Sequence, residues 1–278
     1  MAQSADPAEI SDPAALRAVR FPRGTTLRAI WALLMREVAT SYGQAFGGVV
    51  WAFLQPTLAI LFLTAIFSAG FRSPPVGDNF AIFYASGMMP FMFYLSLSSQ
   101  LGMAVRANAR LLAYPRVTLI DALLARMIFA TLIQLLVTVA LYTLILLIWD
   151  PKVHLQFGPI ATGLAVTALF GAGVGSVHAY IFVMFPTYRQ IWSIVTQPLF
   201  LLSCILFSYE QVPAPFDDWL WYNPLIHPVA TSRSGFYPGY NDHHVDLLYP
   251  IGLGLGLLVL GLILLNQGRG RILSRMRP

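Results

Sequence analysis

Six stretches without a charged residue constrain the fold of this chain more than any other feature. A helix that crosses the hydrocarbon core of a bilayer needs about 20 mostly apolar residues, and each stretch can hold that number. The stretches lie between Glu37 and Arg72, Asp78 and Arg106, Arg126 and Asp150, Lys152 and Arg189, Arg189 and Glu210, and Asp246 and Arg269. We therefore predict an all-α integral membrane protein with six transmembrane helices, near residues 46–70, 80–104, 122–149, 159–184, 190–208 and 247–266.

The composition agrees with a membrane protein and argues against nucleic-acid binding. Of the 278 residues 57% are hydrophobic and 10% are charged, whereas soluble domains carry about 25% charged residues. The net charge is +5, but the basic residues cluster at the ends of apolar blocks instead of forming one basic face. The single cysteine, Cys204, excludes an intrachain disulfide.

The distribution of arginine and lysine predicts the orientation, because cytoplasmic connections are enriched in these residues. With both termini inside, the inner side holds fourteen of the 17 basic residues, and the outer side holds only Arg72, Lys152 and Arg233. We predict that the N- and C-termini are cytoplasmic.

Four regions follow along the chain. Residues 1–24 are expected to form a flexible cytoplasmic tail, 46–268 the six-span transmembrane domain, and 269–278 a basic cytoplasmic tail. Residues 25–45 are predicted to form an amphipathic helix in the membrane interface, with a cytoplasmic extension of the first span as the alternative. Its apolar residues at helical spacing are Leu27, Ile30, Trp31, Leu34 and Val38, and Arg28, Arg36 and Glu37 lie off that stripe.

The inner connection from Arg106 to Arg126 holds four arginines and one aspartate between two charge-free blocks. Its first residues can form a short helix, and Pro115 biases Tyr114 away from helical geometry. We expect a cytoplasmic partner to act on the membrane part here. Arg126, at the start of the third span, is expected to extend its charge to the interface.

The outer segment 209–246 is too apolar for a solvated loop and too broken by prolines for another span. A run of Trp219, Leu220, Trp221 and Tyr222 is followed by the break at Asn223-Pro224. We predict that this segment enters the membrane from outside and turns back as a helical hairpin, and a hairpin lying flat on the outer surface is the alternative.

Several kinds of active chemistry find no support in the sequence. The one lysine, Lys152, does not stand in a phosphate-binding loop, so we expect no ATP site and no cofactor on this chain. His178 is the one ionisable side chain well inside a span, and we expect it to bond to a facing helix instead of relaying protons. Asp242, His243, His244 and Asp246 lack a spaced third ligand, so we expect no metal site.

The sequence does not decide the roles of two features within the predicted spans, three aromatic residues and two glycine pairs. Phe91, Phe93 and Tyr94 fall mid-span and could line a conduit where rings stack on sugars, although core filling is the more frequent role of such residues. The pairs Gly171/Gly175 and Gly252/Gly256 have the spacing that allows close helix approach, which favours packing within one subunit.

Three motifs together resemble one family, the membrane subunit of ABC-2 type polysaccharide exporters, and within it the capsular polysaccharide permeases. The first motif is REVATSYG from Arg36 through Tyr42 to Gly43, followed by Gly47, Gly48, Trp51 and Pro56. The second is NARLLAYPRVTLIDALLAR over residues 108–126. The third is WYNPLIH over 221–227, followed by RSGFYPGY over 233–240. The resemblance covers about residues 25–266, and it departs where Met127-Ile128-Phe129 follow Arg126 and a glutamate is expected nearby.

The resemblance implies a homodimer in a Gram-negative inner membrane, with each subunit docked on a separate ATPase subunit that binds ATP and Mg²⁺. It implies a lipid-linked polysaccharide as substrate and periplasmic and outer-membrane export proteins as further partners. It also implies roles for two sets of residues. The ATPase-coupling loop would contain Arg106, Asn108, Arg110, Tyr114, Pro115, Arg116 and Asp121, and the outer re-entrant gate Trp219, Trp221, Asn223, Pro224, His227 and Arg233.

Two other classes of protein remain as alternatives. A small-molecule or drug permease of the same class would share the topology, and only the second and third motifs argue against it. A polytopic membrane glycosyl- or acyltransferase would need converging titratable groups, for which only the group near Asp242 qualifies.

Overall fold

The computed structural model describes residues 28, 30–37, 46–109, 112, 118–149 and 155–276, without the side chains of 46–49 and 276. This described part is all-helical and contains no strand, which confirms the predicted fold class at that level. Of the predicted residues in the coupling loop and the first motif, Tyr42, Gly43, Arg110, Tyr114, Pro115 and Arg116 lie outside it.

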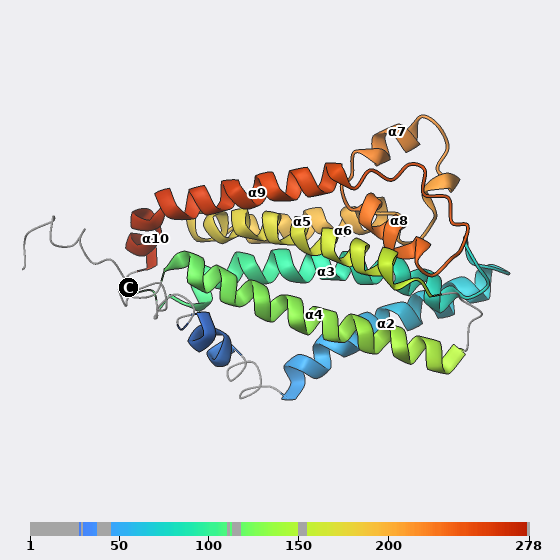
Figure 1. Ribbon diagram of the computed structural model, residues 1–278, viewed down its shortest axis with the longest axis horizontal. Coiled ribbons are helices and arrows are strands. Elements are labelled where there is room, and N and C mark those ends of the chain that lie inside the picture. Colours follow the sequence, from blue (N-terminus) through green and yellow to red (C-terminus); the bar gives the residue numbers. More distant parts are fainter. Residues whose placement is uncertain are drawn as a thin grey trace, which may run out of the picture.

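In the described part of the chain, five helices are long and apolar enough to cross a membrane. They are α2 (Phe46–Gly70), α3 (Phe80–Ala107), α4 (Leu119–Trp149), α5 (Phe157–Met184) and α9 (Leu248–Gln267). They run side by side along the long axis of the molecule (Figure 1). Each begins and ends within a few residues of a predicted span, because long charge-free segments define both.

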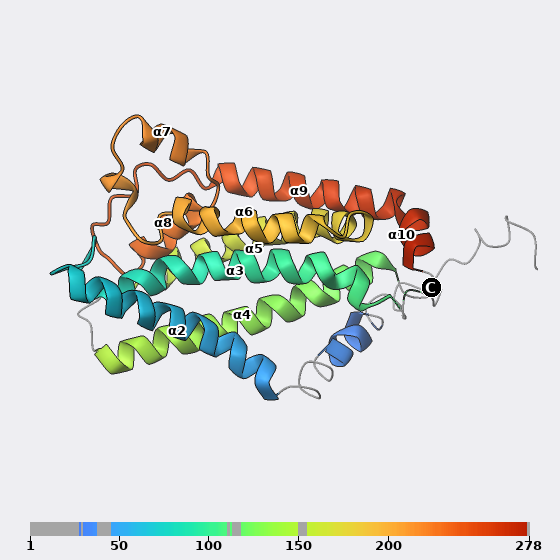
Figure 2. The same cartoon turned by 180° about the vertical axis from the view of Figure 1, so that it is seen from behind.

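The predicted span at residues 190–208 is represented by a shorter helix. Helix α6 (Tyr188–Leu202) has 15 residues and lies alongside α5 (Figure 2). After it the chain turns at Ser203 and Cys204, and Cys204 adopts the left-handed conformation with φ of 54°. The carbonyl groups of residues 204, 205 and 207 then point to the guanidinium group of Arg233.

Helices α3 and α5 form the centre of the bundle, and most of their residues are buried. Glycines of α5 allow the close approach: a Cβ atom on Gly175 would lie 2.7 Å from Leu101 Cβ of α3, and one on Gly173 would collide with Gly254 of α9. Gly171 also packs on α3, whereas Gly252 and Gly256 have open space around them. The first predicted pair, Gly171 and Gly175, therefore allows close helix packing within the subunit. The second pair, Gly252 and Gly256, does not; the glycine of α9 that packs closely is Gly254, which lies between them.

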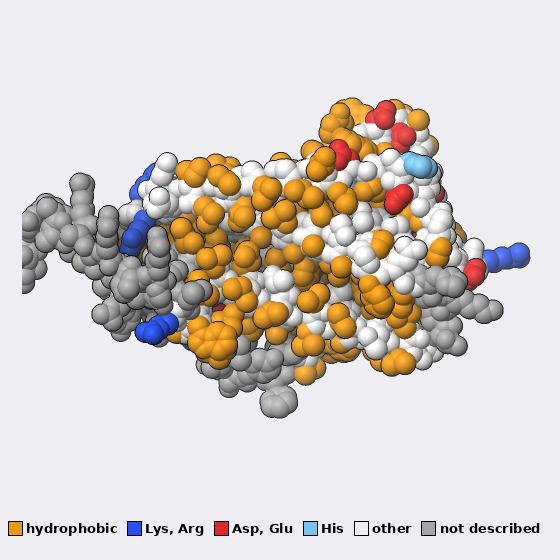
Figure 3. Space-filling view, viewed as in Figure 1, with side chains coloured by type: hydrophobic (Ala, Val, Ile, Leu, Met, Phe, Trp, Pro, Cys, Tyr) orange, Lys and Arg blue, Asp and Glu red, His pale blue; other side chains and the backbone are white. Residues whose placement is uncertain are grey.

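The two ends of the bundle differ in charge, as Figure 3 shows. We call the end with α10 (Arg269–Met276) and the helical residues 30–37 the basic end, and the end with α7 and α8 the acidic end. Residues of the predicted basic tail form α10, where Ile272 is buried and Arg275 Nη1 donates to the Met184 carbonyl at 2.5 Å.

The acidic end carries three short helices, η3 (Tyr209–Gln211), α7 (Phe216–Trp221) and α8 (Ile226–Ser234). Helix α7 projects from the bundle and has no buried residue, whereas α8 packs on α3 and α5 with nearly all of its residues buried (Figure 1). The outer segment is therefore one exposed helix followed by one helix inserted between the ends of the long ones.

Candidate functional site

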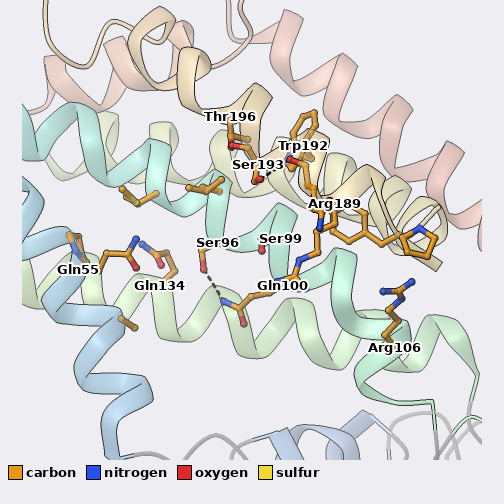
Figure 4. A pocket seen from close by; sticks show the side chains of 17 residues that line it. Gln55, Ser96, Ser99, Gln100, Arg106, Gln134, Arg189, Trp192, Ser193 and Thr196 are labelled. Atoms are coloured by element: carbon orange, nitrogen blue, oxygen red, sulfur yellow. Dashed lines mark hydrogen bonds between the residues drawn. The ribbon is translucent and has the colours of Figure 1, made fainter. Parts of the chain in front are cut away.

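A cavity of about 800 Å³ lies among α2, α3, α4, α5 and α6, and its lining is unusually polar for a membrane-length bundle (Figure 4). Polar side chains are costly inside a membrane and usually mark a substrate or ion path. The polar lining residues are Gln55, Ser96, Ser99, Gln100, Arg106, Gln134, Arg189, Gln190, Ser193 and Thr196. The others are mainly apolar: Ala52, Pro56, Met92, Leu95, Phe182, Pro186 and Trp192.

The hydroxyl and amide groups that line the cavity use only part of their hydrogen-bonding capacity within the protein. Gln100 Nε2 donates to Ser96 Oγ at 2.8 Å, and the hydroxyls of Ser193 and Thr196 donate to carbonyls of their own helix at 2.7 and 3.0 Å. A hydroxyl that donates within its helix keeps acceptor capacity, and an amide has two donors and an acceptor. The cavity can therefore exchange hydrogen bonds with a polyhydroxylated ligand.

The α3 residues that line the cavity lie on one face of the helix, and their spacing in the sequence reveals this face. Met92, Leu95, Ser96, Ser99 and Gln100 follow the spacing i, i+3, i+4, i+7 and i+8 of a single helix face. The serines and the glutamine of this stripe stand within a charge-free window. Charges and aromatic rings did not reveal this stripe, because its polar members carry neither.

The predicted conduit aromatics lie on another side of α3. Phe91, Phe93 and Tyr94 are at most 2% exposed, and none of them lines the cavity. The ring of Tyr94 stacks on that of Phe170 at 5.4 Å, and the ring of Phe91 meets that of Phe200 edge-on at 5.4 Å. In this subunit the three rings fill the core.

The aromatic lining of the cavity comes instead from Phe182 and Trp192, and His178 lies behind these rings. The His178 ring stacks on Phe182 at 4.9 Å and meets Trp192 edge-on at 4.5 Å, and its Nδ1 finds no hydrogen-bond partner in the described part of the chain. Its position supports packing of the lining rings.

A polar network at the basic end connects three parts of the chain. Arg126 of α4 forms an ion pair with Glu37 of the helical residues 30–37. Asn108, 2% exposed, follows α3; its Oδ1 accepts from Arg36 Nη1 at 2.7 Å, and its Nδ2 faces Glu37 Oε1 at 3.5 Å. We call these four residues the basic-end network.

This network corrects the expectation for Arg126. The side chain does not simply extend toward the interface, since a carboxylate 89 residues earlier in the sequence pairs with it. The glutamate that the family resemblance leads one to expect near Arg126 is thus present in space, although it comes from another helix. Arg36 and Glu37 lie on the predicted polar face of their helix, and this face meets the bundle.

The other described residues predicted for the coupling loop take different roles. Arg106 lines the cavity. Asp121 accepts from the Thr118 amide at 3.0 Å, and the Thr118 hydroxyl accepts from the Asp121 amide at 3.1 Å. This reciprocal arrangement is a capping box that starts α4, and Thr-Leu-Ile-Asp is its signature in the sequence. Trp51, predicted with the first span, is 61% exposed on α2.

Two of the predicted gate residues hold α7 to the bundle through backbone contacts. Trp221 Nε1 donates to the His244 carbonyl at 2.9 Å, and Asn223 Nδ2 donates to the Leu202 carbonyl at 2.9 Å. Asn223 Oδ1 also accepts from the Leu225 amide, across Pro224, at 3.1 Å. Trp219 is 79% exposed.

His227 connects α7, α8 and the start of α9. It is fully buried, its Nδ1 accepts from the Asp246 amide at 3.2 Å, and its Nε2 lies 3.2 Å from the Trp221 carbonyl. These partners assign the neutral tautomer with the proton on Nε2. Nearby, burial lowers the pKa of His244 to about 4, and its ring stacks on Tyr209 at 4.2 Å.

Arg233 is the most unusual side chain of the acidic end because it is fully buried without an acidic partner in the described part. Its guanidinium group donates to the carbonyls of Cys204, Ile205 and Phe207 at 3.0, 3.3 and 3.4 Å and lies 4.2 Å from the Phe83 ring centroid. It thereby fixes the turn after α6.

An all-helical bundle of membrane length with an open cavity lined by hydroxyl and amide groups is the architecture expected of a membrane transport subunit. In the described residues, no three His, Cys, Asp or Glu side chains come together as a metal site. The fold therefore points to passage of a polar ligand, and comparison with known proteins makes the class specific.

Residues 28–237 match the family model of the ABC-2 type transporter, so the chain belongs to this family. It is 31% identical over 237 residues to the polysialic acid transport protein KpsM of Escherichia coli, covering 84% of this chain and 90% of that protein. It is 27% identical over 241 residues to the capsule polysaccharide export inner-membrane protein CtrC of Neisseria meningitidis, covering 84% and 89%. Identity to the capsule polysaccharide export inner-membrane protein BexB of Haemophilus influenzae is 25% over 244 residues, covering 86% and 91%. The suspected family resemblance is confirmed.

Proposed function

We propose that this chain is the permease subunit of an ABC exporter that moves capsular or related lipid-linked polysaccharide across the bacterial inner membrane. The observation that carries the proposal is the cavity of about 800 Å³ lined by serine, threonine and glutamine side chains within a membrane-length bundle. Sugar hydroxyls both donate and accept hydrogen bonds, as these side chains do. The polysaccharide export roles in the names of the relatives KpsM, CtrC and BexB support the substrate class.

The energy comes from a separate subunit in this proposal. The 278 residues contain no phosphate-binding loop, so ATP and Mg²⁺ bind to two copies of a cytoplasmic ABC ATPase that dock on a homodimer of this chain. Periplasmic and outer-membrane export proteins receive the polymer. The basic end is cytoplasmic, consistent with the enrichment of arginine there.

The ATPase contact is proposed for the connection between α3 and α4. This connection begins beside the basic-end network, so a displacement of the loop reaches α4 through Arg126 and the helical residues 30–37 through Glu37. Asn108, the first residue after α3, is tied to the helical residues 30–37 through Arg36 and Glu37.

We further propose six crossings, with α6 as the fifth, and an outer re-entrant hairpin made of α7 and α8. A helix of 15 residues is about 22 Å long, short of the hydrocarbon core of about 30 Å. In this proposal the turn at residues 203–207 and the buried helix α8 span the rest of the hydrocarbon core. Arg233 donates hydrogen bonds to the backbone carbonyls that the irregular turn leaves without helical partners.

Export itself tests the function. In a capsule-producing strain that lacks its own permease, this chain together with its cognate ATPase subunit is expected to restore cell-surface polysaccharide, measured by extraction and immunoblot. A partner whose phosphate-binding lysine is replaced should restore none. The purified chain without the ATPase is expected to hydrolyse no ATP, and transporter-like hydrolysis by it would contradict the proposal.

Thiol labelling tests the hairpin. Single cysteines at residues 219–234 in a Cys204→Ala background are probed from outside with a membrane-impermeant maleimide. Re-entry predicts high labelling at the exposed Trp219 and low labelling at Leu225 and Val229, which are 1% exposed. Labelling should change when ATP hydrolysis is trapped. Uniformly high labelling that ignores the nucleotide state would instead describe a hairpin on the surface.

A further inference from the structure

The cavity is charged at one place only, where Arg106 in the last turn of α3 and Arg189 in the first turn of α6 line it. We infer that this part of the cavity is an oxyanion-binding site that receives a phosphate or carboxylate group of the exported chain, with Arg106 and Arg189 as the binding residues. The inference rests on the proposed function and specifies which substrate group is bound first.

The side chains of the two cavity arginines make no hydrogen bond or ion pair within the described part of the chain. By contrast, Arg126 pairs with Glu37 and Arg275 donates to the Met184 carbonyl. A guanidinium group offers five donors in a planar fork that matches phosphate and carboxylate oxygens. Both cavity arginines keep this capacity for a ligand.

Among the described residues, no carboxylate near the cavity is available to neutralise them. None of the lining residues is acidic. Of the carboxylates near the basic end, Glu37 contacts Arg126 and Asn108, and Asp121 is 4% exposed and caps α4. The stretches 38–45 and 110–117 contain no aspartate or glutamate in their sequence. The positive charge therefore acts on whatever enters the cavity.

Neighbouring groups add to the attraction for an anion. Arg189 lies at the N-terminus of a 15-residue helix, where the helix dipole favours negative charge. Gln100 and Gln190 supply amide donors in the same cavity. Figure 4 shows Arg106 and Arg189 toward one side of the cavity and Gln55 and Gln134 toward the other, so the ligand would meet charge and uncharged polar groups in succession.

The opposite end of the molecule disfavours retention of the same ligand. The acidic end carries Asp78, Glu210, Asp217, Asp218, Asp242 and Asp246, and its buried Arg233 is occupied by backbone carbonyls. An anionic group of the exported polymer is attracted at the basic end, where the polymer enters, and repelled at the acidic end, where it leaves. This polarity suits a ligand that enters at the basic end and leaves at the acidic end.

Binding measurements on the full chain test the site. The chain, in nanodiscs of zwitterionic phosphatidylcholine, is titrated by calorimetry with dodecyl phosphate, inorganic phosphate and oligogalacturonate, using dodecyl maltoside as the uncharged comparison. Arg106→Gln and Arg189→Gln should each weaken anion binding about tenfold, the loss expected for a charge-assisted hydrogen bond. The matched control Arg271→Gln removes an exposed charge of α10, outside the cavity, and should bind as the wild type does.

The three anions separate the possible sources of the oxyanion. Binding of dodecyl phosphate but not oligogalacturonate assigns the phosphate of a lipid linkage, the reverse assigns carboxylates of an acidic polymer, and binding of inorganic phosphate shows that the anion alone suffices. Absence of binding in every case, or equal weakening in Arg271→Gln, would overturn the site. Should Arg106→Gln fail to fold, Arg106→Lys, which keeps the charge, is expected to retain binding.

The export assay separates this inference from the proposed function. If the wild-type chain restores surface polysaccharide but neither cavity arginine affects anion binding, the oxyanion site is wrong and the permease function stands. If the wild-type chain restores no polysaccharide, the function itself fails.

Discussion

Replacing Arg126 with glutamate is expected to release the helical residues 30–37 from the bundle and to abolish most export. The ion pair with Glu37 is the main charged contact that holds this helix, and the two side chains are only 19% and 8% exposed. Breaking a pair that is largely removed from water costs about 3 kcal/mol, because the remaining carboxylate stays buried after losing its guanidinium counter-charge. Glu37 would then face a second carboxylate.

Docking of this helix is measured at Leu33, which is 3% exposed. A Leu33→Cys variant in the Cys204→Ala background should resist a maleimide added to the basic end, and it should react when Arg126→Glu is present. The double variant Glu37→Arg/Arg126→Glu should restore part of the protection and part of export. Full restoration is not expected because the new arginine stands next to Arg36.

Arg28→Glu is the matched control for this experiment. Arg28 is exposed next to the helical residues 30–37, so its reversal changes the net charge of the basic end by the same amount without touching the basic-end network. If Arg28→Glu exposed Leu33→Cys as strongly as Arg126→Glu does, general attraction of the helix to lipid phosphate would explain the docking and the ion pair would be irrelevant.

The long helices could be predicted from the sequence because the requirement of the bilayer is local. A charge-free run of about 20 apolar residues satisfies it whatever the rest of the chain does. Helices α2 to α5 and α9 accordingly coincide with predicted spans. The end of α6 could not be predicted in this way, since the group that fixes it, Arg233, lies about 30 residues further along the chain.

The site was harder to predict because its residues are brought together by packing. Glu37 and Arg126 are 89 residues apart, and no local pattern connects them. The cavity is different: the stripe of Ser96, Ser99 and Gln100 on one helix face was readable, whereas the nearby Phe91 and Tyr94 attracted attention and are buried in the core. In this bundle the uncharged polar stripe lines the cavity, and the aromatic cluster does not.

Replacing Arg233 with glutamine is expected to loosen the turn after α6 and the helix α8 that carries Arg233. The side chain is fully buried and donates to three carbonyl groups that no other helix satisfies at these positions. Loss of the guanidinium group leaves at least one buried carbonyl without a hydrogen-bond donor. Each charge-assisted hydrogen bond contributes about 1.5–3 kcal/mol to the free energy of unfolding. The expected result is a melting temperature about 10 °C lower and loss of export.

Cys204, the one cysteine in the chain, reports on this turn directly. It is 2% exposed, its carbonyl accepts from Arg233, and it holds a left-handed backbone. Wild-type Cys204 should resist maleimide, and Arg233→Gln should make it reactive. Gly87→Ala should act in the same direction, because the added Cβ atom would lie 2.6 Å from Arg233 Nη2 and displace the guanidinium group. Arg233→Lys keeps the charge but loses the planar fork, so intermediate reactivity is expected.

Arg72→Gln is the control that separates this local effect from a change in net charge at the acidic end. Arg72 is exposed in the connection between α2 and α3, so its loss should leave both the melting temperature and the protection of Cys204 unchanged. If Cys204 stayed protected in Arg233→Gln and in Gly87→Ala while export failed, Arg233 would act on the substrate and not on the turn. If export, protection and melting temperature all remained at the wild-type level, the buried guanidinium group would have no role in holding the acidic end.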